Sequence, residues 1–424
     1  MAKLIRTITR LIFFVILFCF WWAWFWVIQI LTFKKHIRPK SQRSKENTSN
    51  AITDTVIKSD SNPLLSPSEM DWDREGAFNP AALYINDRVH LLYRAMGSDG
   101  VSRIGYASSP DGVNFDERLP YPIYTPQGPQ EIANENQVDI NHQKFDKNYR
   151  SGGGWCGCED PRAVYIEEDK KIYLSYVAFA GWNSIRIAVT SIDVDDFLNK
   201  RWNWSRPVYL TEPQVIAKSG AFFPERIKGD LVFNYRVFHQ NTNPPAPRTH
   251  FARIRNINPR TPVTNTNSNP YIQPEHNPEI KRWYSGKPSF GSPPIKTRIG
   301  WLVIQVAVAG RWEWPGSDMS CYRLGAIILD TNDLTKVLHQ TNEAFIEPTQ
   351  WYENDWKPGV VYCCGAVVKD EKLFIYYGSG DKHTSLATAD FSEFIDAIET
   401  EMESGPESVV IKNNIKKHGN IRIT

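Results

Sequence analysis

Short runs of apolar and aromatic residues, each ended by a tight polar turn, recur between about Trp72 and Ala397. The first copy runs from Phe78 through the polar pair Asn86-Asp87 to Arg94, with an apolar strand on either side of the turn. Four further copies follow, with first strands that begin at Asp160, Phe223, Pro293 and Cys364. Short strands bounded by turn residues are typical of all-β proteins.

The fivefold recurrence separates two all-β architectures. A β-sandwich also contains alternating strands, but it does not require one hairpin plan to return five times with a distinctive residue entering each inner strand. Repeats of this kind indicate the blades of a propeller. The pattern therefore predicts an all-β fold, a five-bladed β-propeller.

A longer apolar run precedes the hairpins. It extends over residues 11–33 and is apolar except at Gln29 and Thr32. At about 1.5 Å per residue, a helix of this length spans the roughly 30 Å hydrocarbon core of a bilayer. The run is followed by Lys34-Lys35-His36 and not by the small-residue cleavage site of a signal peptide. Residues 1–33 are therefore predicted to contain one transmembrane helix, an uncleaved single-pass anchor.

The charges beside this run predict its orientation. Lys3, Arg6 and Arg10 precede it, and a larger basic group follows: Lys34, Lys35, Arg38, Lys40, Arg43 and Lys45. Cytoplasmic flanks carry the excess of Lys and Arg, although long domains can cross a membrane regardless of charge. The soluble domain is therefore predicted to be cytoplasmic.

Composition divides the rest of the chain. Residues 34–70 are polar and lack aromatic side chains, so they are predicted to form a flexible stem. Residues 71–400 hold the propeller, the predicted catalytic domain, and residues 401–424 form a loose tail. Polar stretches at about 120–154 and 256–286 predict loops on one face. A short helix is predicted before the tail from apolar residues at helical spacing: Phe391, Phe394, Ile395 and Ile398.

Charge and cysteine spacing exclude several classes of function. The net charge is +2, and no basic stripe is visible, which argues against a nucleic-acid partner. The six cysteines include no CxxC pair and no Cys/His cluster with zinc spacing, so no metal site is expected. The aromatic content of Trp 15, Tyr 18 and Phe 21 suits strand formation, and it also suits stacking against the apolar faces of sugars.

Unusual polar residues collect at or near the hairpin starts: Asn79, Asp160, Arg162, Glu225, Lys287 and Asp381. The innermost strands of a propeller converge on its axis, so we expect these side chains to meet in one funnel. Cleavage of a glycosidic bond needs such a cluster. It requires a carboxylic acid to protonate the leaving oxygen and a second carboxylate or a bound anion on the far side.

Several short motifs occur in a fixed order: Asn79-Pro80-Ala81, Glu159-Asp160-Pro161-Arg162, Phe223-Pro224-Glu225, Gly300-Trp301-Leu302, Tyr352-Glu353 and Tyr376-Tyr377-Gly378. Each motif is weak when taken singly, whereas the ordered set is specific. In this set the chain resembles glycoside hydrolase family 130, the β-mannoside phosphorylases. The resemblance covers about Asn79 to Ala389, which is nearly the whole soluble domain.

The resemblance implies an inverting attack of inorganic phosphate on a β-mannoside, which gives α-mannose 1-phosphate and a shortened acceptor. Mannose-containing oligosaccharide and phosphate are the implied partners, with phosphate as co-substrate and no cofactor. Asp160 matches the family's general acid, whose proton is thought to pass through a sugar hydroxyl. Arg162, Arg236 and Lys287 match basic positions near phosphate, and Asp381 matches a pocket acid. Further candidates for binding substrate or phosphate are Asn79, Arg94 and Arg103.

Departures from the family pattern keep two alternatives open. Gln305-Val306-Ala307 stands where the family usually has Tyr-His-Gly, so a histidine often placed near phosphate is missing. One alternative is a β-mannoside hydrolase on the same fold, in which a glutamate activates water. Glu225 is the main candidate for that base, with Glu347 and Glu353 also available. The other alternative is an inactive propeller that binds glycans at a membrane.

Overall fold

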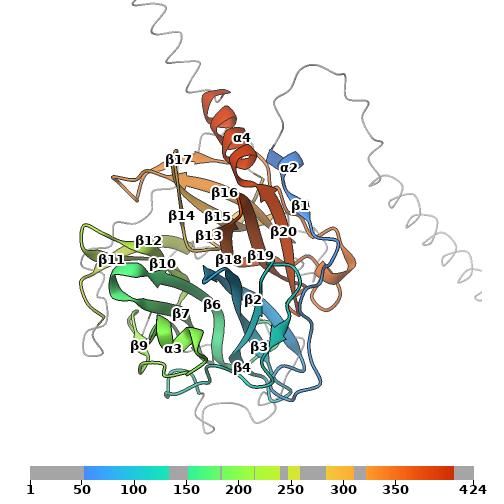
Figure 1. Cartoon of the computed structure of the whole chain (residues 1–424), viewed down its shortest axis with the longest axis vertical. Coiled ribbons are helices and arrows are strands. Elements are labelled where there is room, and N and C mark those ends of the chain that lie inside the picture. The colour runs from blue at the N-terminus through green and yellow to red at the C-terminus, as the bar shows by residue number, and fades with distance from the viewer. Residues whose placement is uncertain are drawn as a thin grey trace, which may run out of the picture. The chain divides into compact units, whose positions relative to one another are not determined.

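The computed structural model describes residues 52–132, 151–181, 184–213, 215–238, 247–257, 283–309 and 321–404 (Figure 1). The chain divides into two compact units, residues 1–48 and 49–424, and every described residue belongs to the second. The predicted transmembrane helix therefore lies outside the described residues, and the membrane anchor and its orientation stay predictions. Within the described ranges, no helix has both the length and the apolar character needed to cross a membrane.

The described part of the chain is mostly β and contains five groups of antiparallel strands, called units I to V. A short parallel pairing, Val101↔Cys156 and Ser102↔Gly157, joins units I and II into one sheet. Unit I contains β2 (Gly76–Ile85), β3 (Arg88–Met96), β4 (Val101–Ser109) and β5 (Glu117–Arg118). Unit II contains β6 (Cys156–Ile166), β7 (Lys171–Ala180), β8 (Ile185–Asp193) and β9 (Val208–Tyr209), and α3 (Val194–Leu198) follows β8. Unit III contains β10 (Ala217–Ile227), β11 (Asp230–Phe238) and β12 (Pro247–Ile254).

The last two units complete the set. Unit IV contains β13 (Gly286–Phe290), β14 (Ile295–Thr297), β15 (Gly300–Ala309), β16 (Cys321–Leu329) and β17 (Val337–Gln340). Unit V contains β18 (Val361–Lys369), β19 (Lys372–Ser379) and β20 (His383–Asp390), and the early strand β1 (Ile57–Lys58) pairs with its outer edge. Two further helices are α2 (Ile52–Thr55) and α4 (Phe391–Ser404), and short 3-10 turns lie at Glu167–Asp169 and Trp351–Glu353.

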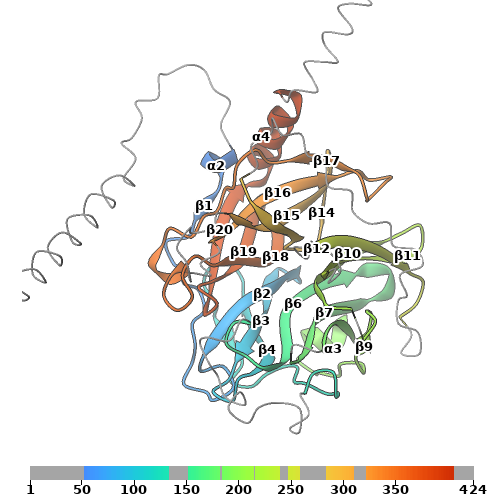
Figure 2. The ribbon, with the colours of Figure 1, turned by 180° about the vertical axis from the view of Figure 1, so that it is seen from behind.

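The five units form a closed ring, most of whose contacts run between first strands. Strand β2 contacts β6, β6 contacts β10, and β10 contacts β13. Unit IV reaches β18 through β15 and β16, and β18 contacts β2 again. Figures 1 and 2 show β18, β2 and β6 side by side from opposite directions. The prediction of an all-β, propeller-like fold is thus confirmed.

Separate hydrophobic clusters join each unit to the next. Leu92 of unit I packs with Leu174 of unit II in one cluster, and other apolar residues of unit II pack with unit III in a second. Phe223 of unit III meets Trp301 of unit IV in another. Two more clusters join unit IV to unit V and unit V to unit I. Each sheet therefore buries both faces against its neighbours, which explains why the strands are apolar on both sides.

A one-residue bulge recurs at the start of the first strand in every unit. The residue before the bulge pairs with the second strand as Phe78↔Arg94, Glu159↔Val177, Lys218↔Arg236, Gly286↔Val308 and Cys363↔Tyr377. The next residue is Asn79, Asp160, Ser219, Lys287 or Cys364, and in each unit Pro or Gly follows it. Such bulges bend a strand and redirect its side chains. The ring thus carries one redirected residue per unit.

Two of the predicted hairpin starts were misplaced. In unit III the one-residue bulge lies at Ser219-Gly220, and a second, wider register shift lies between Phe222 and Arg226, around the predicted start at Phe223-Pro224. In unit IV the first strand is β13, whereas the predicted start at Pro293 falls beside β14, close to the turn into β15. In unit III glycine follows the bulge residue and tolerates this backbone distortion, so no proline marks that position.

The folded unit begins earlier than the predicted boundary at residue 71. Strand β1 pairs with β20 through Ile57↔Thr388 and Lys58↔Ala387, and Ile52 is buried in the cluster that contains α4. The ammonium of Lys58 lies 2.6 Å from Oε1 of Glu353, whose side chain is fully buried. The prediction of a flexible stem is therefore wrong for residues 52–70, because this polar stretch completes an open sheet edge.

At the other end of the chain, the helix predicted before the tail is confirmed as α4. This helix continues to Ser404, so it includes the first residues of the predicted tail at 401–424. Residues from 405 onward lie outside the described ranges, as do most of the predicted loops at 120–154 and 256–286.

A chain that begins at Ser66 is expected to be much less stable than one that begins at Ile52. The shorter chain lacks β1, and the buried Glu353 carboxylate loses its cation. Removing one partner of a buried ion pair costs about 3–5 kcal/mol. Equilibrium denaturation of both truncated proteins measures the difference. Equal midpoints would show that residues 52–65 do not belong to the cooperative fold.

Candidate active site

The bulges of units I and II place Asn79 and Asp160 next to each other. Both residues have left-handed backbone conformations, with φ of 49° and 48°, which Asn and Asp tolerate better than most residues. The amide nitrogen Nδ2 of Asn79 donates to Oδ1 of Asp160 at 2.8 Å. Asp160 is buried except for 8% of its surface. The sequence prediction that these two positions converge is therefore supported by a direct contact.

Arg94 connects Asp160 to a second buried carboxylate, that of Glu159. Its Nη1 donates to Asp160 Oδ1 at 3.2 Å, and its Nη2 donates to Glu159 Oε1 at 3.0 Å. The remaining contacts run to the Ser102 hydroxyl at 3.1 Å and the Ser151 carbonyl at 2.7 Å. All three guanidinium nitrogens of Arg94 therefore donate hydrogen bonds, and these bonds hold the group between two adjacent carboxylates.

A lysine from unit III completes the environment of Glu159. Lys218, the residue before the third bulge, approaches Glu159 Oε2 at 3.3 Å. The hydroxyl of Ser151 donates to the same carboxylate, at 2.6 Å from Oε1 and 2.7 Å from Oε2. Glu159 is fully buried, and its negative charge is compensated by Arg94 and Lys218. This carboxylate therefore organises the cations and is not available as a base.

The pKa of Asp160 is lowered from its ordinary value. Burial works in the opposite direction, because it disfavours the charged carboxylate. That effect is outweighed by the positive charges of Arg94 and Lys218, by the hydrogen bond from Asn79, and by the charge of Arg162. Asp160 is consequently ionised at neutral pH in the protein without substrate.

Arg162 holds the backbone of the site and does not face Asp160 as a free cation. Its Nε donates to the carbonyl of Gly291 at 2.7 Å, and its Nη1 donates to the carbonyl of Asp160 at 3.1 Å. The guanidinium carbon also lies 6.0 Å from the centroid of the Tyr362 ring. This buried arginine therefore joins unit II to unit IV. Its role in the structure is scaffolding, whereas the sequence analysis placed it near phosphate.

Arg236 occupies in unit III the register position that Arg94 occupies in unit I, so the two flank Asp160 of unit II. Burial lowers the pKa of Arg236 from its ordinary value, although the nearby hydroxyls of Tyr362 and Tyr322 and the carboxylate of Asp160 oppose that change. The two tyrosine rings meet edge to face at 6.0 Å. Arg236 thus lies in an aromatic wall beside Asp160.

Three residues in or near this wall, Ser219, Lys218 and Tyr362, were not identified from the sequence. The Ser219 hydroxyl lies 3.0 Å from the Tyr362 hydroxyl, and Ser219 has a left-handed φ of 58° like Asn79 and Asp160. The signal that would have found Ser219 and the preceding Lys218 is the Ser-Gly pair at the third bulge. Tyr362 stands directly before the cysteine pair at the fifth bulge, so the same register would have placed it.

Asp381 belongs to the edge of this cluster. Its Oδ2 lies 3.0 Å from Nζ of Lys357, and its charge contributes to the raised pKa of Arg94. The same carboxylate contributes, after burial, to raising the pKa of Tyr322 to about 12. Asp381 therefore acts electrostatically on Arg94 and Tyr322, and its role as a pocket acid stays a prediction.

Glu225 is not brought to the cluster, which corrects its assignment as a catalytic residue. It lies six positions beyond the bulge residue Ser219 on the same strand, or roughly 20 Å along an extended chain. There it pairs with Lys296 at 2.8 Å, and the two side chains are 38% and 58% exposed. The misplaced third hairpin start produced this error.

Two other candidates, Arg103 and Lys287, differ in position. Arg103 pairs with Asp99 at 2.7 Å on the third strand of unit I, and no described contact joins it to Asp160. Lys287 occupies the bulge of unit IV, but its side chain lies outside what the structure describes. Within the described residues, no group of three or more His, Cys, Asp or Glu side chains is placed to hold a metal ion.

Glu347 and Glu353, the other glutamates available as alternative bases, form ion pairs that do not involve Asp160. Glu347 pairs with Arg323 at 3.1 Å. The carboxylate of Glu353 is fully buried and binds Lys58. Neither residue has a described contact with Asp160. The carboxylates that do lie near Asp160 are therefore Glu159, held by two cations, and Asp381.

Comparison with known proteins places the chain in a family. The family model described as beta-1,4-mannooligosaccharide phosphorylase, that of glycoside hydrolase family 130, matches residues 58–400. A 1,2-beta-oligomannan phosphorylase of Thermoanaerobacter sp. (strain X514) is 31% identical over 344 residues, which cover 78% of this chain and 96% of the relative. A beta-1,2-mannobiose phosphorylase of the same organism is 31% identical over 340 residues, 77% of this chain and 94% of the relative.

Solved structures show the same fold. The beta-1,2-mannobiose phosphorylase from Listeria innocua, in complex with beta-1,2-mannobiose, superposes with a TM-score of 0.60 at 20% sequence identity. The superposition covers 82% of this chain and 99% of that structure. The alignment therefore spans nearly the whole of that enzyme's chain.

Replacing Arg94 with Met is expected to destabilise the protein by about 3–5 kcal/mol, because two buried carboxylates then share one cation fewer. The same change at Arg103, whose ion pair with Asp99 is partly exposed, should cost about 1 kcal/mol or less. Chemical denaturation of the two variants at neutral pH tests this contrast. Similar losses would contradict the assignment of Arg94 as the central cation.

The Arg94→Met effect should also depend on pH. The lowered pKa of Asp160 contributes stability that is present above the ordinary value of 3.8 and is lost as the pH falls through the native value. Arg94→Met removes part of that contribution. The difference from the wild type should therefore be largest near neutral pH and shrink in acid.

Proposed function

The chain belongs to glycoside hydrolase family 130, and on that basis we propose that it is an inverting phosphorylase of β-1,2-linked mannosides. Family membership makes it an enzyme of the group that acts on β-mannosides and oligomannans. The proposed linkage follows the two relatives at 31% identity, both of which are named for β-1,2-mannoside phosphorolysis. Phosphate is the second substrate.

The excess of positive charge around Asp160 carries this proposal. Four cations act on Asp160 electrostatically: Arg94, Arg162, Lys218 and Arg236. Three carboxylates lie near them, Glu159, Asp160 and Asp381, and Lys357 adds a further cation paired with Asp381. A site for water as nucleophile needs a carboxylate base, whereas a site for phosphate needs cations that bind its oxygens. The charge balance favours phosphate.

In the proposed reaction, a phosphate oxygen attacks the anomeric carbon of the mannosyl group and forms the C1–O–P linkage. The C1–O bond to the acceptor sugar breaks, and its electrons go to the leaving oxygen. Asp160 supplies the proton, which passes through a sugar hydroxyl to that oxygen. Phosphate is already anionic, so no base is needed.

The lowered pKa of Asp160 is compatible with this role once phosphate is bound. A general acid must carry a proton, and Asp160 without substrate is surrounded by cations that favour its ionised form. A bound phosphate offsets these charges and adds negative charge nearby, and both effects raise the pKa of a carboxyl group. Asp160 thus becomes a competent acid in the complex.

Hydrolysis is the second candidate because of the residue at position 306. Val306 is buried and pairs with Ser289 and Leu324 within unit IV, so it supplies no charge where the family pattern has histidine. Against hydrolysis, Glu225, Glu347 and Glu353 are each held in ion pairs with no described contact to Asp160. The absent histidine weakens a phosphate contact without creating a base.

Incubation with β-1,2-mannobiose, with and without phosphate, distinguishes the candidates. We expect α-mannose 1-phosphate to form only when phosphate is present. Asp160→Asn should lower turnover by about 10²-fold or more, the scale of general acid catalysis. Glu225→Gln serves as the matched carboxylate control and should remain within roughly twofold of wild type, as a surface change away from the site.

Each other outcome identifies a different activity. Release of free mannose without phosphate, together with a damaging Glu225→Gln, would support the hydrolase. Binding of the disaccharide with no product in either buffer would support the inactive glycan-binding propeller.

Arg236→Met is expected to raise the KM for phosphate by roughly ten- to a hundredfold, because a charge-assisted hydrogen bond is worth about 1.5–3 kcal/mol. The KM for the mannoside should change far less. Arg103→Met, which removes a cation paired with Asp99, should leave the KM for phosphate unchanged. Steady-state kinetics with each substrate varied in turn measures both values, and equal effects of the two variants would contradict the placement of phosphate beside Arg236.

A further inference from the structure

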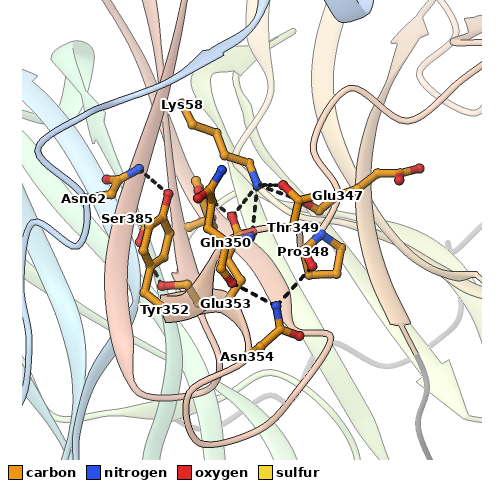
Figure 3. A network of polar contacts seen from close by, with 12 residues as sticks. Lys58, Asn62, Glu347, Pro348, Thr349, Gln350, Tyr352, Glu353, Asn354 and Ser385 are labelled. Atoms are coloured by element: carbon orange, nitrogen blue, oxygen red, sulfur yellow. Dashed lines mark hydrogen bonds and ion pairs between the residues drawn. The ribbon is translucent and has the colours of Figure 1, made fainter. Parts of the chain in front are cut away.

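The early strand β1 contacts the loop that joins β17 to β18 (residues 341–360, called the closing loop below). The ammonium of Lys58 lies 2.6 Å and 2.7 Å from the two carboxylate oxygens of Glu353. It also donates to the carbonyl of Glu347 at 2.7 Å and to the hydroxyl of Thr349 at 3.2 Å (Figure 3). Lys58 therefore contacts three residues of the closing loop.

Glu353 connects Lys58 to Gln350 of the closing loop and to Tyr377 of unit V. Its Oε2 accepts a hydrogen bond from the backbone N–H of Gln350 at 2.8 Å, and its Oε1 accepts one from the Tyr377 hydroxyl at 2.9 Å. Tyr377 stands in unit V at the register position that Arg94 and Arg236 occupy in units I and III. The Lys58–Glu353 pair thus links β1 to the inner end of β19.

The closing loop in turn holds the turn that carries Asp381. The backbone N–H of Lys357 donates to the carbonyl of Gly380 at 3.0 Å, and the N–H of Gly380 donates to the carbonyl of Val360 at 3.0 Å. The ammonium of Lys357 lies 3.0 Å from Oδ2 of Asp381. Asp381 has a left-handed φ of 52°, so its position depends on these neighbours.

Residues 52–70, called the early segment, make a second contact with the turn that carries Asp381. The Ser66 hydroxyl lies 2.9 Å from Nδ1 of His383, and Nε2 of that ring lies 3.0 Å from Oδ2 of Asp355 in the closing loop. Lys382 pairs with the same Asp355 carboxylate at 2.8 Å. The early segment therefore contacts both sides of the junction between the closing loop and the Asp381 turn.

We propose that Lys58 is a positioning residue for the active site, which acts through Glu353 and the closing loop to fix Lys357 and Asp381. The role assigned to Asp381, binding sugar hydroxyls beside Asp160, rests on the function proposed above. Loss of Lys58 leaves the closing loop free to move and displaces Asp381. Small misplacements of a substrate-positioning group lower turnover by as much as about 10²-fold.

Two variants separate positioning from simple stabilisation. Lys58→Met leaves the buried Glu353 carboxylate without its cation and is expected to lower Tm. The double variant Lys58→Met/Glu353→Gln removes both charges, so its Tm should recover most of the loss. Both variants should lower kcat/KM for β-1,2-mannobiose about ten- to a hundredfold and leave the KM for phosphate nearly unchanged. Lys58→Arg should retain most of the wild-type value.

Lys171→Met is the matched control. Lys171 is likewise a terminal residue of a strand, the first of β7, and it pairs with a single carboxylate, that of Asp193, at 2.6 Å. That pair lies at the turn end of unit II and is partly exposed, so its loss should change neither Tm nor kcat/KM appreciably.

A double variant with restored Tm and wild-type kcat/KM would overturn the proposal and leave Lys58 as a stabilising residue only. Hydrogen exchange provides a readout that does not require turnover. In both Lys58 variants, amides of residues 351–360 and 380–383 should exchange faster than in wild type. Unchanged exchange there contradicts the proposal. Faster exchange in a protein that shows no phosphorolysis would retain the coupling and reject the proposed function.

Discussion

The buried contact of Arg94 with Glu159 and Asp160 is the interaction on which the site depends. All three side chains are almost completely buried, and a buried charge that loses its partner is costly. Arg94 comes from unit I, both carboxylates come from unit II, and Lys218 of unit III completes the set. Three neighbouring units are thus joined at their inner ends by charge, while apolar clusters join them elsewhere.

The repeated bulge explains how these charges come to face one another. In each unit one extra residue redirects the first strand at the same register, so residues far apart in the chain reach equivalent places in the ring. Proline follows the bulge residue at Asn79 and Asp160, and the sequence therefore identified both sites correctly. At Ser219 the following residue is glycine, and the nearest Phe-Pro pair was chosen in its place. The assignment of Glu225 as a catalytic residue is wrong for this reason.

Which arginines reach the site depends on pairing between strands, and pairing does not follow from motif order. Arg94 pairs with Phe78 just before the bulge, whereas Arg103 lies on the next strand and turns to Asp99. Both are arginines among apolar residues in the sequence, so composition does not separate them. The early segment was misjudged for a related reason. A two-residue strand such as β1 has no periodicity, and its stability comes from the edge of β20 that it covers.

The same cations that lower the pKa of Asp160 also make the site suitable for an anion, and these two properties are linked. Without an anion, the positive charges are compensated by ionising Asp160, which then lacks the proton that a general acid must supply. With phosphate bound, part of that compensation passes to the phosphate oxygens, and protonation of Asp160 becomes more favourable. In the proposed phosphorolysis, the arrival of the nucleophile thus prepares the acid. A water molecule carries no charge and has no such effect, so this arrangement of Arg94, Lys218 and Arg236 suits phosphorolysis better than hydrolysis.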